Sequence, residues 1–332
     1  MRAVLVRKFG AWSDLQVEDV SEPKPGPRDV LIETANMGVN FRDVLLIGGH
    51  YQLRPPLPFA PGMECAGVIA EVGSEVTGFA PGDRVAAEVD YGAYAERVVA
   101  AADSCYRLPE SMSFEHAAAL GLAYQAAHFA LTDHAHLSFG ERVLVTGAAG
   151  GVGFAAVQIA KAQGGKVIAG IRGMDQAEVV REAGADLVVD LSVDDLSEHL
   201  REQVNQFTND HGVDVALDPV GDEVFNACLD ALAPGGRLVS VGFASGQVPT
   251  VDINKLLRRN LTVMGLNWRH YRLNEPDRVQ RIQYEMYELY ELGKLTPHVM
   301  HVYGLEDFAR ALELIAAGNV QGKVVLSNQP RG

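Results

Sequence analysis

The sequence predicts an α/β protein in which a doubly wound parallel sheet accompanies a smaller, β-rich, barrel-like domain. From residue 143 onward, short aliphatic runs alternate with helical segments, which is the pattern of a parallel sheet with helical crossovers. A cluster of glycines at 147–153 separates the first of these strands from the helix that follows it. Residues 1 to about 122 instead contain short alternating segments between turns rich in Pro and Gly.

Length, charge and cysteine content exclude several classes of protein. The 332 residues suffice for two domains of ordinary size. With 43 acidic and 28 basic side chains the net charge is -15, which disfavours nucleic acid and anionic membranes as partners. No apolar run is long enough to span a bilayer, and the first residues show no signal-peptide pattern. Because Cys65, Cys105 and Cys228 imply no disulfide framework, we expect a soluble cytoplasmic protein.

The first 122 residues are expected to form a compact barrel of short strands. Alternating apolar and polar residues predict the strands, and Pro–Gly clusters predict the turns. The predicted strands include 3–6, 30–34 and 66–72, and the turns include 23–27 and 80–83. An Ala-rich stretch, 113–131, is predicted to be helical and leads into the glycine cluster.

Six strands, with helices between most of them, are predicted in the middle of the chain. The strands are 143–146, 167–171, 187–190, 213–218, 237–241 and 261–266, and the helices include 177–183 and 196–207. After Trp268 the pattern predicts two more helices, 277–295 and 305–317, and a final strand, 323–326, that rejoins the first domain. Such alternation is typical of a doubly wound sheet, which binds ligands beyond the carboxyl ends of its strands.

The glycine cluster has the spacing of a dinucleotide-binding turn, Ala148-x-Gly150-x-x-Gly153. Gly150 lets the backbone approach a pyrophosphate, Gly153 lets the helix pack tightly on the strand, and the helix N-terminus faces the anion. We predict that a dinucleotide contacts this turn; the alternative is a tight corner without ligand. The predicted contacts are Gly147, Ala148, Gly150, Gly151, Val152 and Gly153 in the turn, and Pro219, Val220, Gly242 and Phe243 in loops after two later strands, which could also be plain turns.

The end of the second strand of the sheet indicates which dinucleotide binds. Sheets that bind NAD usually carry Asp or Glu there, to hold the ribose 2′-hydroxyl. Here the end of the strand reads Ala-Gly-Ile-Arg-Gly, residues 169–173. No acid is present, and Arg172 occupies the position where that acid would stand. A guanidinium pairs well with phosphate, so we predict NADPH as the cofactor. The alternative is that Arg172 is a solvated loop charge.

Taken together, these motifs resemble the medium-chain dehydrogenase/reductase superfamily and, within it, the zinc-independent NADPH:quinone oxidoreductase (zeta-crystallin-like) family. The resemblance covers nearly the whole chain and rests on segments 38–43, 61–67, 78–85, 147–153, 218–221 and 241–246. It implies a GroES-like β-barrel-type catalytic domain, 1–122, completed by 267–332, and a Rossmann dinucleotide-binding domain, 123–266. It also implies that the cofactor lies in the cleft between these domains.

The resemblance also bears on metal content. Zinc alcohol dehydrogenases of this superfamily place a Cys in the segment that matches 40–43 and a His before the Glu that matches Glu64. This chain has no Cys in the first segment and Met63 in the second, and it lacks a lobe of four clustered Cys. Because zinc needs three N, S or O protein ligands and a thioether is a poor one, we predict no metal. Without that Lewis acid, hydride transfer to a quinone or another conjugated carbonyl is favoured over alcohol oxidation.

Candidate catalytic residues come from the same resemblance. It implies that Asn40, Asp43 and Tyr51 line the cleft, with Asn40 bonding near the nicotinamide or the substrate carbonyl and Tyr51 donating a proton or hydrogen bond. The alternative for all three is turn packing. Lys323 is predicted as a further cofactor contact. The chain departs from the family at Ala126, Gln176 and Leu191, and the last two leave Arg172 as the main predicted contact of the 2′-phosphate.

Two other functions and one partner are also considered. An enoyl-thioester reductase of the acryloyl-CoA type would need a basic patch for the CoA phosphates, for which the candidates are Arg54, Arg258, Arg259, Arg269 and Arg272. A non-catalytic protein that binds NADPH or RNA is the other alternative, and the net charge disfavours RNA. The apolar segment 260–266 is predicted to be a sheet edge that joins two copies into a homodimer, unless a loop covers it.

Overall fold

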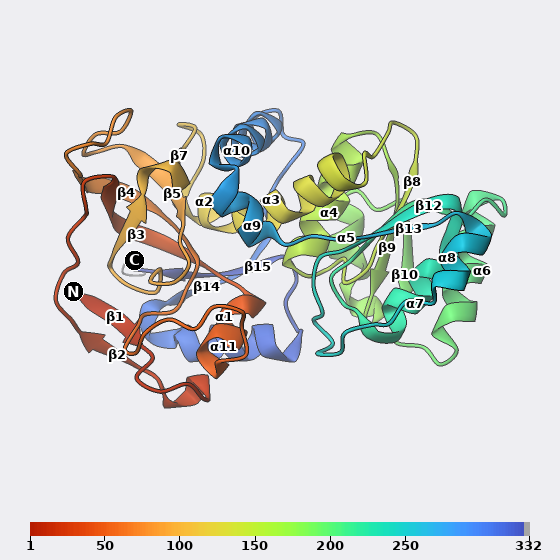
Figure 1. The fold of residues 1–332 in the computed structure, drawn as a ribbon, viewed down its shortest axis with the longest axis horizontal. Helices are drawn as coiled ribbons and strands as arrows, with labels where there is room; N and C mark the ends of the chain where they lie inside the picture. Colours follow the sequence, from red (N-terminus) through yellow and green to blue (C-terminus); the bar gives the residue numbers. More distant parts are fainter. Residues whose placement is uncertain (329–332) are drawn as a thin grey trace. The chain divides into compact units, whose positions relative to one another are not determined.

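The computed structural model describes residues 1–328, and the chain divides into two compact units. Unit 1 contains residues 1–122 and 272–291 and the chain from residue 297 on, and unit 2 contains Ala123–Tyr271 and Leu292–Thr296. Each unit has its own sheet and its own buried core. Figure 1 shows the sheet of each unit with helices packed around it.

Unit 2 is built on six parallel strands in the spatial order β10-β9-β8-β11-β12-β13. The strands are β8 (Arg142–Val145), β9 (Lys166–Ile171), β10 (Leu187–Asp190), β11 (Val213–Asp218), β12 (Leu232–Ser240) and β13 (Thr262–Gly265). Numbered along the chain this order is 3-2-1-4-5-6, the doubly wound arrangement. The predicted fold class is confirmed. The strand order reverses between β8 and β11, and the crevice there is the usual ligand site of such sheets.

Several of the helices in this part of the chain bury apolar faces against the sheet. The helices from residue 122 to 274 are α3 (Leu122–His128), η3 (Phe129–His134), α4 (Gly151–Ala162), η4 (Met174–Gln176), α5 (Ala177–Glu182), α6 (Leu196–Thr208), α7 (Asp222–Ala231), α8 (Ile253–Arg259) and α9 (Trp268–Asn274). In α6, Leu196, Leu200 and Val204 recur at helical spacing and are buried against α7 and the sheet. In α4, every residue from Gly153 to Ala160 is buried, as expected for a helix packed tightly on its strand.

Unit 1 contains a seven-stranded sheet in which β3 is the central strand. The order is β14-β15-β3-β4-β5-β7, β6 also pairs with β3, and a small separate sheet joins β1 to β2. The strands are β1 (Arg2–Leu5), β2 (Gln16–Asp19), β3 (Asp29–Val39), β4 (Glu64–Val72), β5 (Arg84–Glu88), β6 (Arg97–Ala101), β7 (Cys105–Arg107), β14 (Val299–Gly304) and β15 (Lys323–Ser327). β15 runs antiparallel to β3, so Val324–Ser327 lie beside residues 36–39, and Figure 1 shows the two strands in one sheet.

The helices of unit 1 pack on the faces and ends of this sheet. They are η1 (Trp12–Asp14), α1 (Phe41–Gly48), η2 (Ala102–Ser104), α2 (Phe114–Leu120), α10 (Pro276–Glu291), η5 (Leu305–Asp307) and α11 (Phe308–Ala317). In α11, Phe308, Ala311 and Leu312 are buried, and Gly318 ends the helix in the left-handed conformation that such caps require.

Two helical predictions differ from the structure by more than one residue in where the helices end. The predicted helix 277–295 stops at Glu291, because Gly293 has a φ of +70°, which a helix cannot continue. The predicted helix 113–131 is interrupted at Gly121, where the backbone leaves the helical region. The stretch then continues as α3 and ends in a π-helical segment at Phe129–His134. Apolar periodicity does not reveal such interruptions, because they depend on single backbone angles.

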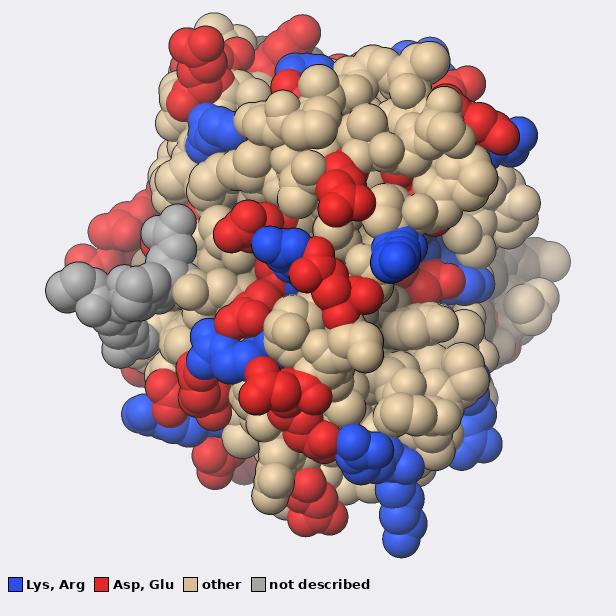
Figure 2. Space-filling view, turned by 90° about the vertical axis from the view of Figure 1, so that its left-hand side faces the viewer, with Lys and Arg blue, Asp and Glu red and all other residues tan. Residues whose placement is uncertain are grey.

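The surface of unit 1 carries charges of both signs. Figure 2 shows acidic and basic side chains interspersed over this face, without an extended basic patch. Several of them are paired, including Arg107 with Asp83 at 2.6 Å and Arg7 with Glu18 at 2.6 Å. Across residues 1–328, no helix combines the length and the apolar character that a membrane span needs.

Candidate active site

The glycine turn of unit 2 connects the buried strand β8 to helix α4. Gly147 has a φ of +55°, a left-handed conformation that favours glycine. Gly150 is the N-cap residue of α4, and no side chain caps the helix there. Gly153 lies against Gly147 with no room for a side chain. The turn therefore presents the N-terminus of a twelve-residue helix without a protein cap, which is the arrangement that binds phosphate in dinucleotide sites.

Asp218, at the end of β11, holds the loop that follows it. The hydroxyl of Thr146 donates to its Oδ1 at 2.6 Å, and the backbone N–H groups of Val220 and Gly221 each donate to the carboxylate at 3.0 Å. Burial raises the pKa of Asp218, and these hydrogen bonds oppose that shift. Because β8 and β11 are neighbours, Asp218 also fixes the loop against the glycine turn.

Four predicted cofactor contacts from two loops lie together at this edge of the sheet. A Cβ at Gly147 would stand 3.2 Å from Val220 and 3.3 Å from Pro219. The next loop lies along the first, because Ala244 N–H donates to the backbone oxygen of Pro219 at 3.0 Å and Ser245 N–H to that of Val220 at 3.0 Å. In that second loop Gly242 and Phe243 are adjacent, and Phe243 is 42% exposed.

Arg172 follows β9, the strand beside β8, and its side chain is exposed. The turn and the end of β9 are directly connected, since Ala148 N–H donates to the backbone oxygen of Gly170 at 3.0 Å. The next residue, Gly173, donates to Asp190 at 3.2 Å, which anchors the Arg172 loop to β10. A cation therefore stands at the position where NAD-binding sheets carry an acid.

In unit 1, Asn40 and Asp43 lie at the start of helix α1 and belong to one buried network. The backbone N–H of Asn40 donates to Asp43 Oδ2 at 2.8 Å, and the hydroxyl of Tyr94 donates to the same oxygen at 2.7 Å. Asp43 is fully buried, and desolvation raises its pKa to about 7 against the opposing hydrogen bonds. Asp43 thus fixes the first turn of α1, in line with the turn-packing alternative considered for it.

The side chain of Asn40 contacts two buried charges. Its Nδ2 donates to Glu64 Oε1 at 2.8 Å, and its Oδ1 accepts a hydrogen bond from Lys323 Nζ at 2.8 Å. Lys323 and Glu64 are themselves ion-paired at 2.6 Å, and their side chains are only 4% and 2% exposed. Lys323 was predicted as a cofactor contact, and the structure places it in this ion pair, beside Asn40.

Tyr51 lies beyond the other end of α1 and is half-buried. Its backbone N–H donates to the backbone oxygen of Leu45 at 3.2 Å. Because a helix rises about 1.5 Å per residue, the backbones of Asn40 and Tyr51 are separated by on the order of 13 Å along the axis of α1. The structure therefore brings Asn40 and Asp43 together at one end of α1, whereas the backbone of Tyr51 lies at the other end.

Four residues of these networks were not among the predicted site residues. Thr146, Asp218 and Glu64 all belong to or adjoin motifs that the sequence made visible, at 147–153, 218–221 and 61–67. Tyr94 had no such signal, because it reaches Asp43 only through tertiary contact between segments 51 residues apart.

The metal prediction concerns the same region of unit 1. Within residues 1–328, no three His, Cys, Asp or Glu side chains gather into a group that could hold a metal ion. All three cysteines are buried thiols, and burial raises the pKa of Cys65 to about 12. Met63, beside Glu64, is also buried.

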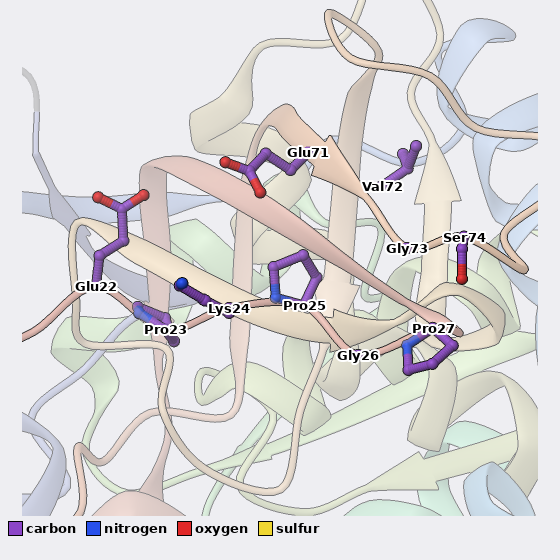
Figure 3. Close-up of a pocket in the computed structure, with 10 residues that line it drawn as sticks. All are labelled: Glu22, Pro23, Lys24, Pro25, Gly26, Pro27, Glu71, Val72, Gly73 and Ser74. Atoms are coloured by element: carbon purple, nitrogen blue, oxygen red, sulfur yellow. The ribbon is translucent and has the colours of Figure 1, made fainter.

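A groove of about 730 Å³ on unit 1 does not belong to this site. Segments 22–27 and 71–74 line it, and Figure 3 shows prolines forming one wall. In β4, Glu64 pairs with Gly38 whereas Glu71 pairs with Leu31. Seven residues of strand separate the two positions, which is roughly 23 Å at about 3.3 Å per residue. The groove and Asn40 thus lie at opposite ends of β3 and β4.

Three of the five arginines considered for a CoA site have other contacts. Arg259 donates to the backbone oxygens of Leu229 and Asp230 at 2.9 and 3.3 Å, which anchors α8 to the end of α7. Arg272 is ion-paired with Asp90 and is 10% exposed. Arg54 stacks on Phe9, with its guanidinium carbon 5.0 Å from the ring centroid. These side chains stabilise the fold, and none of these contacts indicates a phosphate site.

A doubly wound sheet with an uncapped glycine turn, accompanied by a β-rich unit that the strand β15 completes, defines a two-unit dehydrogenase/reductase. Two family models match the chain: the zinc-binding dehydrogenase model over residues 151–284 and the alcohol dehydrogenase GroES-like domain over residues 26–110. A quinone oxidoreductase-like protein 2 homolog of Nematostella vectensis is 35% identical over 331 residues, which cover 99% of this chain and 89% of that protein.

Solved structures agree with this class. The quinone oxidoreductase of Escherichia coli, solved in complex with NADPH, matches with a TM-score of 0.91 and 30% identity over 98% of this chain and all (100%) of that chain. A mycobacterial protein solved in complex with NADPH matches with a TM-score of 0.92 and 32% identity, again over 98% and 100%. The chain belongs to the quinone oxidoreductase family of the medium-chain dehydrogenase/reductase superfamily, which confirms the resemblance seen in its sequence.

Proposed function

We propose that this protein is an NADPH-dependent oxidoreductase that transfers hydride to a quinone or another conjugated carbonyl without zinc. The observation that carries the proposal is the uncapped glycine turn at the end of β8, with Arg172 at the end of the neighbouring strand. Membership of the quinone oxidoreductase family and the NADPH complexes of its structural neighbours support the same cofactor.

Unit 2 holds the nucleotide in this proposal. The N–H groups at the start of α4, from Gly151 to Gly153, bind the pyrophosphate, and the helix dipole favours its negative charge. Pro219, Val220, Gly242 and Phe243 line the same edge of the sheet and provide apolar contacts and backbone polar groups. The Arg172 guanidinium binds the 2′-phosphate through two parallel hydrogen bonds, which selects NADPH over NADH.

Unit 1 provides the polar groups for the reacting end. Bound NADPH supplies a hydride to a carbon of the acceptor, whose oxygen or α-carbon then takes up a proton. We assign the side-chain amide of Asn40 to a hydrogen bond with the substrate carbonyl or the nicotinamide carboxamide. The phenol of Tyr51 is the proposed proton or hydrogen-bond donor. Asp43 supports Asn40 by fixing the first turn of α1.

Zinc independence rests on the donor set in unit 1. Segment 40–43 offers no Cys, and Met63 offers only a thioether where related zinc dehydrogenases have His. The adjacent carboxylate, Glu64, is already neutralised by the Lys323 ammonium at 2.6 Å. A second cation at this position would be repelled by that ammonium in a buried, weakly screened environment.

The test is turnover with a defined set of acceptors. Purified protein is mixed with NADPH or NADH and with quinones, enones and acryloyl-CoA, and the loss of nicotinamide absorbance is followed before and after chelation of metals. We expect oxidation of NADPH by a quinone or an enone at a rate that chelation does not change. Turnover of acryloyl-CoA alone would instead favour the enoyl-thioester reductase. Binding of NADPH without turnover of any acceptor would indicate a non-catalytic protein, and loss of activity on chelation would refute zinc independence.

We further propose a cytoplasmic homodimer joined through β13. This strand ends the sheet of unit 2 and pairs with β12 on one side only among the described strands. Beside it in the sequence, Ile253 and Leu257 of α8 are 69% and 74% exposed. An open strand edge near exposed apolar side chains is typical of an interface between two copies. The three buried thiols suit a reducing compartment.

A further inference from the structure

Both oxygens of the Glu64 carboxylate accept hydrogen bonds. Oε1 accepts from Lys323 Nζ at 2.6 Å and from Asn40 Nδ2 at 2.8 Å, and Oε2 accepts from the backbone N–H of Leu122 at 2.8 Å. Neighbouring backbone packs closely around the Glu64 carboxylate and leaves it little space for another conformation. A Cβ at Gly38 would stand 2.3 Å from Oε1, and a Cβ at Gly121 would stand 2.7 Å from Oε2. The carboxylate is therefore held in one place by charge-assisted hydrogen bonds and close packing.

All three N–H donors of the Lys323 ammonium have acceptors, just as both oxygens of the Glu64 carboxylate have donors. An ammonium has three N–H donors and no acceptor. These reach Glu64 Oε1, Asn40 Oδ1 at 2.8 Å and the backbone oxygen of Val39 at 3.3 Å. Lys323 thus has no donor left for a ligand. Its two side-chain partners, Glu64 and Asn40, are held next to each other by the shared ammonium.

These two charges determine which way the Asn40 amide points. An ammonium can only donate, so the amide atom beside Lys323 must be the oxygen; a carboxylate can only accept, so the atom beside Glu64 must be the nitrogen. A turned amide would place N–H against ammonium and oxygen against carboxylate. Glu64 uses one hydrogen of Nδ2, which leaves the second hydrogen of Nδ2 for another acceptor. Asn40 is 9% exposed, so only a small part of this residue reaches solvent.

We propose that Glu64 and Lys323 are positioning residues that orient the side-chain amide of Asn40, so that its second N–H faces the reacting carbonyl or the nicotinamide carboxamide. This inference rests on the proposed function for the identity of that acceptor. The orientation itself follows from the hydrogen bonds within unit 1. A purely structural pair would stabilise the junction of β3, β4 and β15 and leave catalysis insensitive to the direction of the amide.

The central variant removes both charges together, as Glu64→Gln with Lys323→Met. Single variants would leave one charge buried without its partner and would unfold the region. In the double variant, the amide oxygen introduced at position 64 keeps the Leu122 N–H, so the amide nitrogen introduced there faces Asn40. The Asn40 amide must then turn its oxygen toward position 64. The matched control is Asp230→Asn with Lys255→Met, which removes an ion pair of 2.6 Å on unit 2.

Kinetics and binding distinguish positioning from a structural role. We expect kcat of the double variant to fall about a hundredfold, as misplaced catalytic groups do, while the unfolding midpoint stays close to that of the control. The calorimetric Kd for NADPH stays the same where the acceptor is the reacting carbonyl and rises where it is the nicotinamide carboxamide. Asn40→Ala is expected to lower kcat in the wild-type protein and to have no further effect in the double variant. Full retention of kcat, or an additive effect of Asn40→Ala, would overturn the inference.

A spectroscopic measurement keeps this test separate from the proposed function. The side-chain amide signals of Asn40 are assigned in ¹⁵N–¹H spectra by their absence in Asn40→Ala. One amide proton should be shifted downfield by its bond to the Glu64 carboxylate, and this shift should disappear in the double variant. An unchanged signal would refute the orientation. If the wild-type protein turns over no acceptor, the proposed function fails, and the spectrum still decides whether Glu64 and Lys323 orient the amide.

Discussion

Gly153 lies so close to Gly147 that a Cβ atom placed on it would stand 2.1 Å from the Gly147 backbone oxygen. This contact brings α4 down onto the end of β8 and orients the helix N-terminus. The obstacle is backbone, which cannot move aside as a flexible side chain would. We expect Gly153→Ala to lower the free energy of unfolding by about 1–3 kcal/mol and to weaken NADPH binding, as measured by denaturant unfolding and calorimetry.

Gly150 offers a matched comparison within the same turn. A Cβ there would meet only the Gly147 oxygen at 3.4 Å, an ordinary contact, and the backbone is extended, with φ −81° and ψ 172°. Gly150→Ala should therefore fold with an unchanged unfolding midpoint. Its methyl group stands where the pyrophosphate would approach, so Kd for NADPH should rise about tenfold or more. Unchanged affinity in Gly150→Ala would argue against a dinucleotide at this turn.

Arg172 is expected to set the preference between the two nicotinamide dinucleotides. Replacing it with Gln removes a charged partner of the 2′-phosphate, and hydrogen bonds to charged groups contribute about 1.5–3 kcal/mol, or roughly 10- to 150-fold. Arg172→Gln should raise KM for NADPH by a factor in this range and leave KM for NADH unchanged. Arg181→Gln, an exposed arginine on α5, is the control. Parallel increases for both cofactors would show that Arg172 does not contact the 2′-phosphate.

Asp43 is expected to make stability depend on pH. Burial raises its pKa to about 7, above the usual value of about 3.9 in an unfolded chain. Between these values the folded state binds more protons than the unfolded state, so this group lowers stability as pH rises from about 4 to about 7. Asp43→Asn should remove that slope, as measured by denaturant midpoints across the pH range.

The control for this experiment is Asp210→Asn, which replaces an exposed carboxylate at a left-handed position, with φ +60°, that Asn tolerates. Its midpoints should follow the wild-type pH dependence. If Asp43→Asn also keeps the wild-type slope between about pH 4 and 7, then Asp43 is ionised throughout that range and the burial argument is wrong.

Gly265 provides a test of the proposed dimer. Leu266 N–H donates to Ser240 on β12 at 3.0 Å, so by strand alternation the N–H of Gly265 points away from β12. A Cβ at this position meets nothing within 4 Å. Gly265→Pro should remove an outward donor and yield monomers in sedimentation analysis, whereas Gly265→Ala should stay dimeric. A wild-type monomer, or a dimeric proline variant, would contradict assembly through β13.

Local patterns predicted most of the sheet of unit 2. Strands 187–190 and 213–218 match β10 and β11 residue for residue, because each is a short aliphatic run that ends at an acid or a turn. Two other strands extend further than predicted. β3 continues to Val39, where residues 36–39 pair with β15, and β12 begins at Leu232, which pairs with Val213 of β11. Pairing partners, which local sequence does not contain, decide such extensions.

The sequence by itself determined the doubly wound sheet, the glycine turn and Arg172 after the second strand, because each depends on residues close together in the chain. Tertiary structure decided the surroundings of Asn40. Glu64 is 24 residues away and Lys323 is 283 residues away, and only the pairing of β3 with β4 and β15 brings them to one amide. A buried ion pair forms where strands that are distant in the sequence bring opposite charges together. The spacing of residues within a single segment does not predict such a contact.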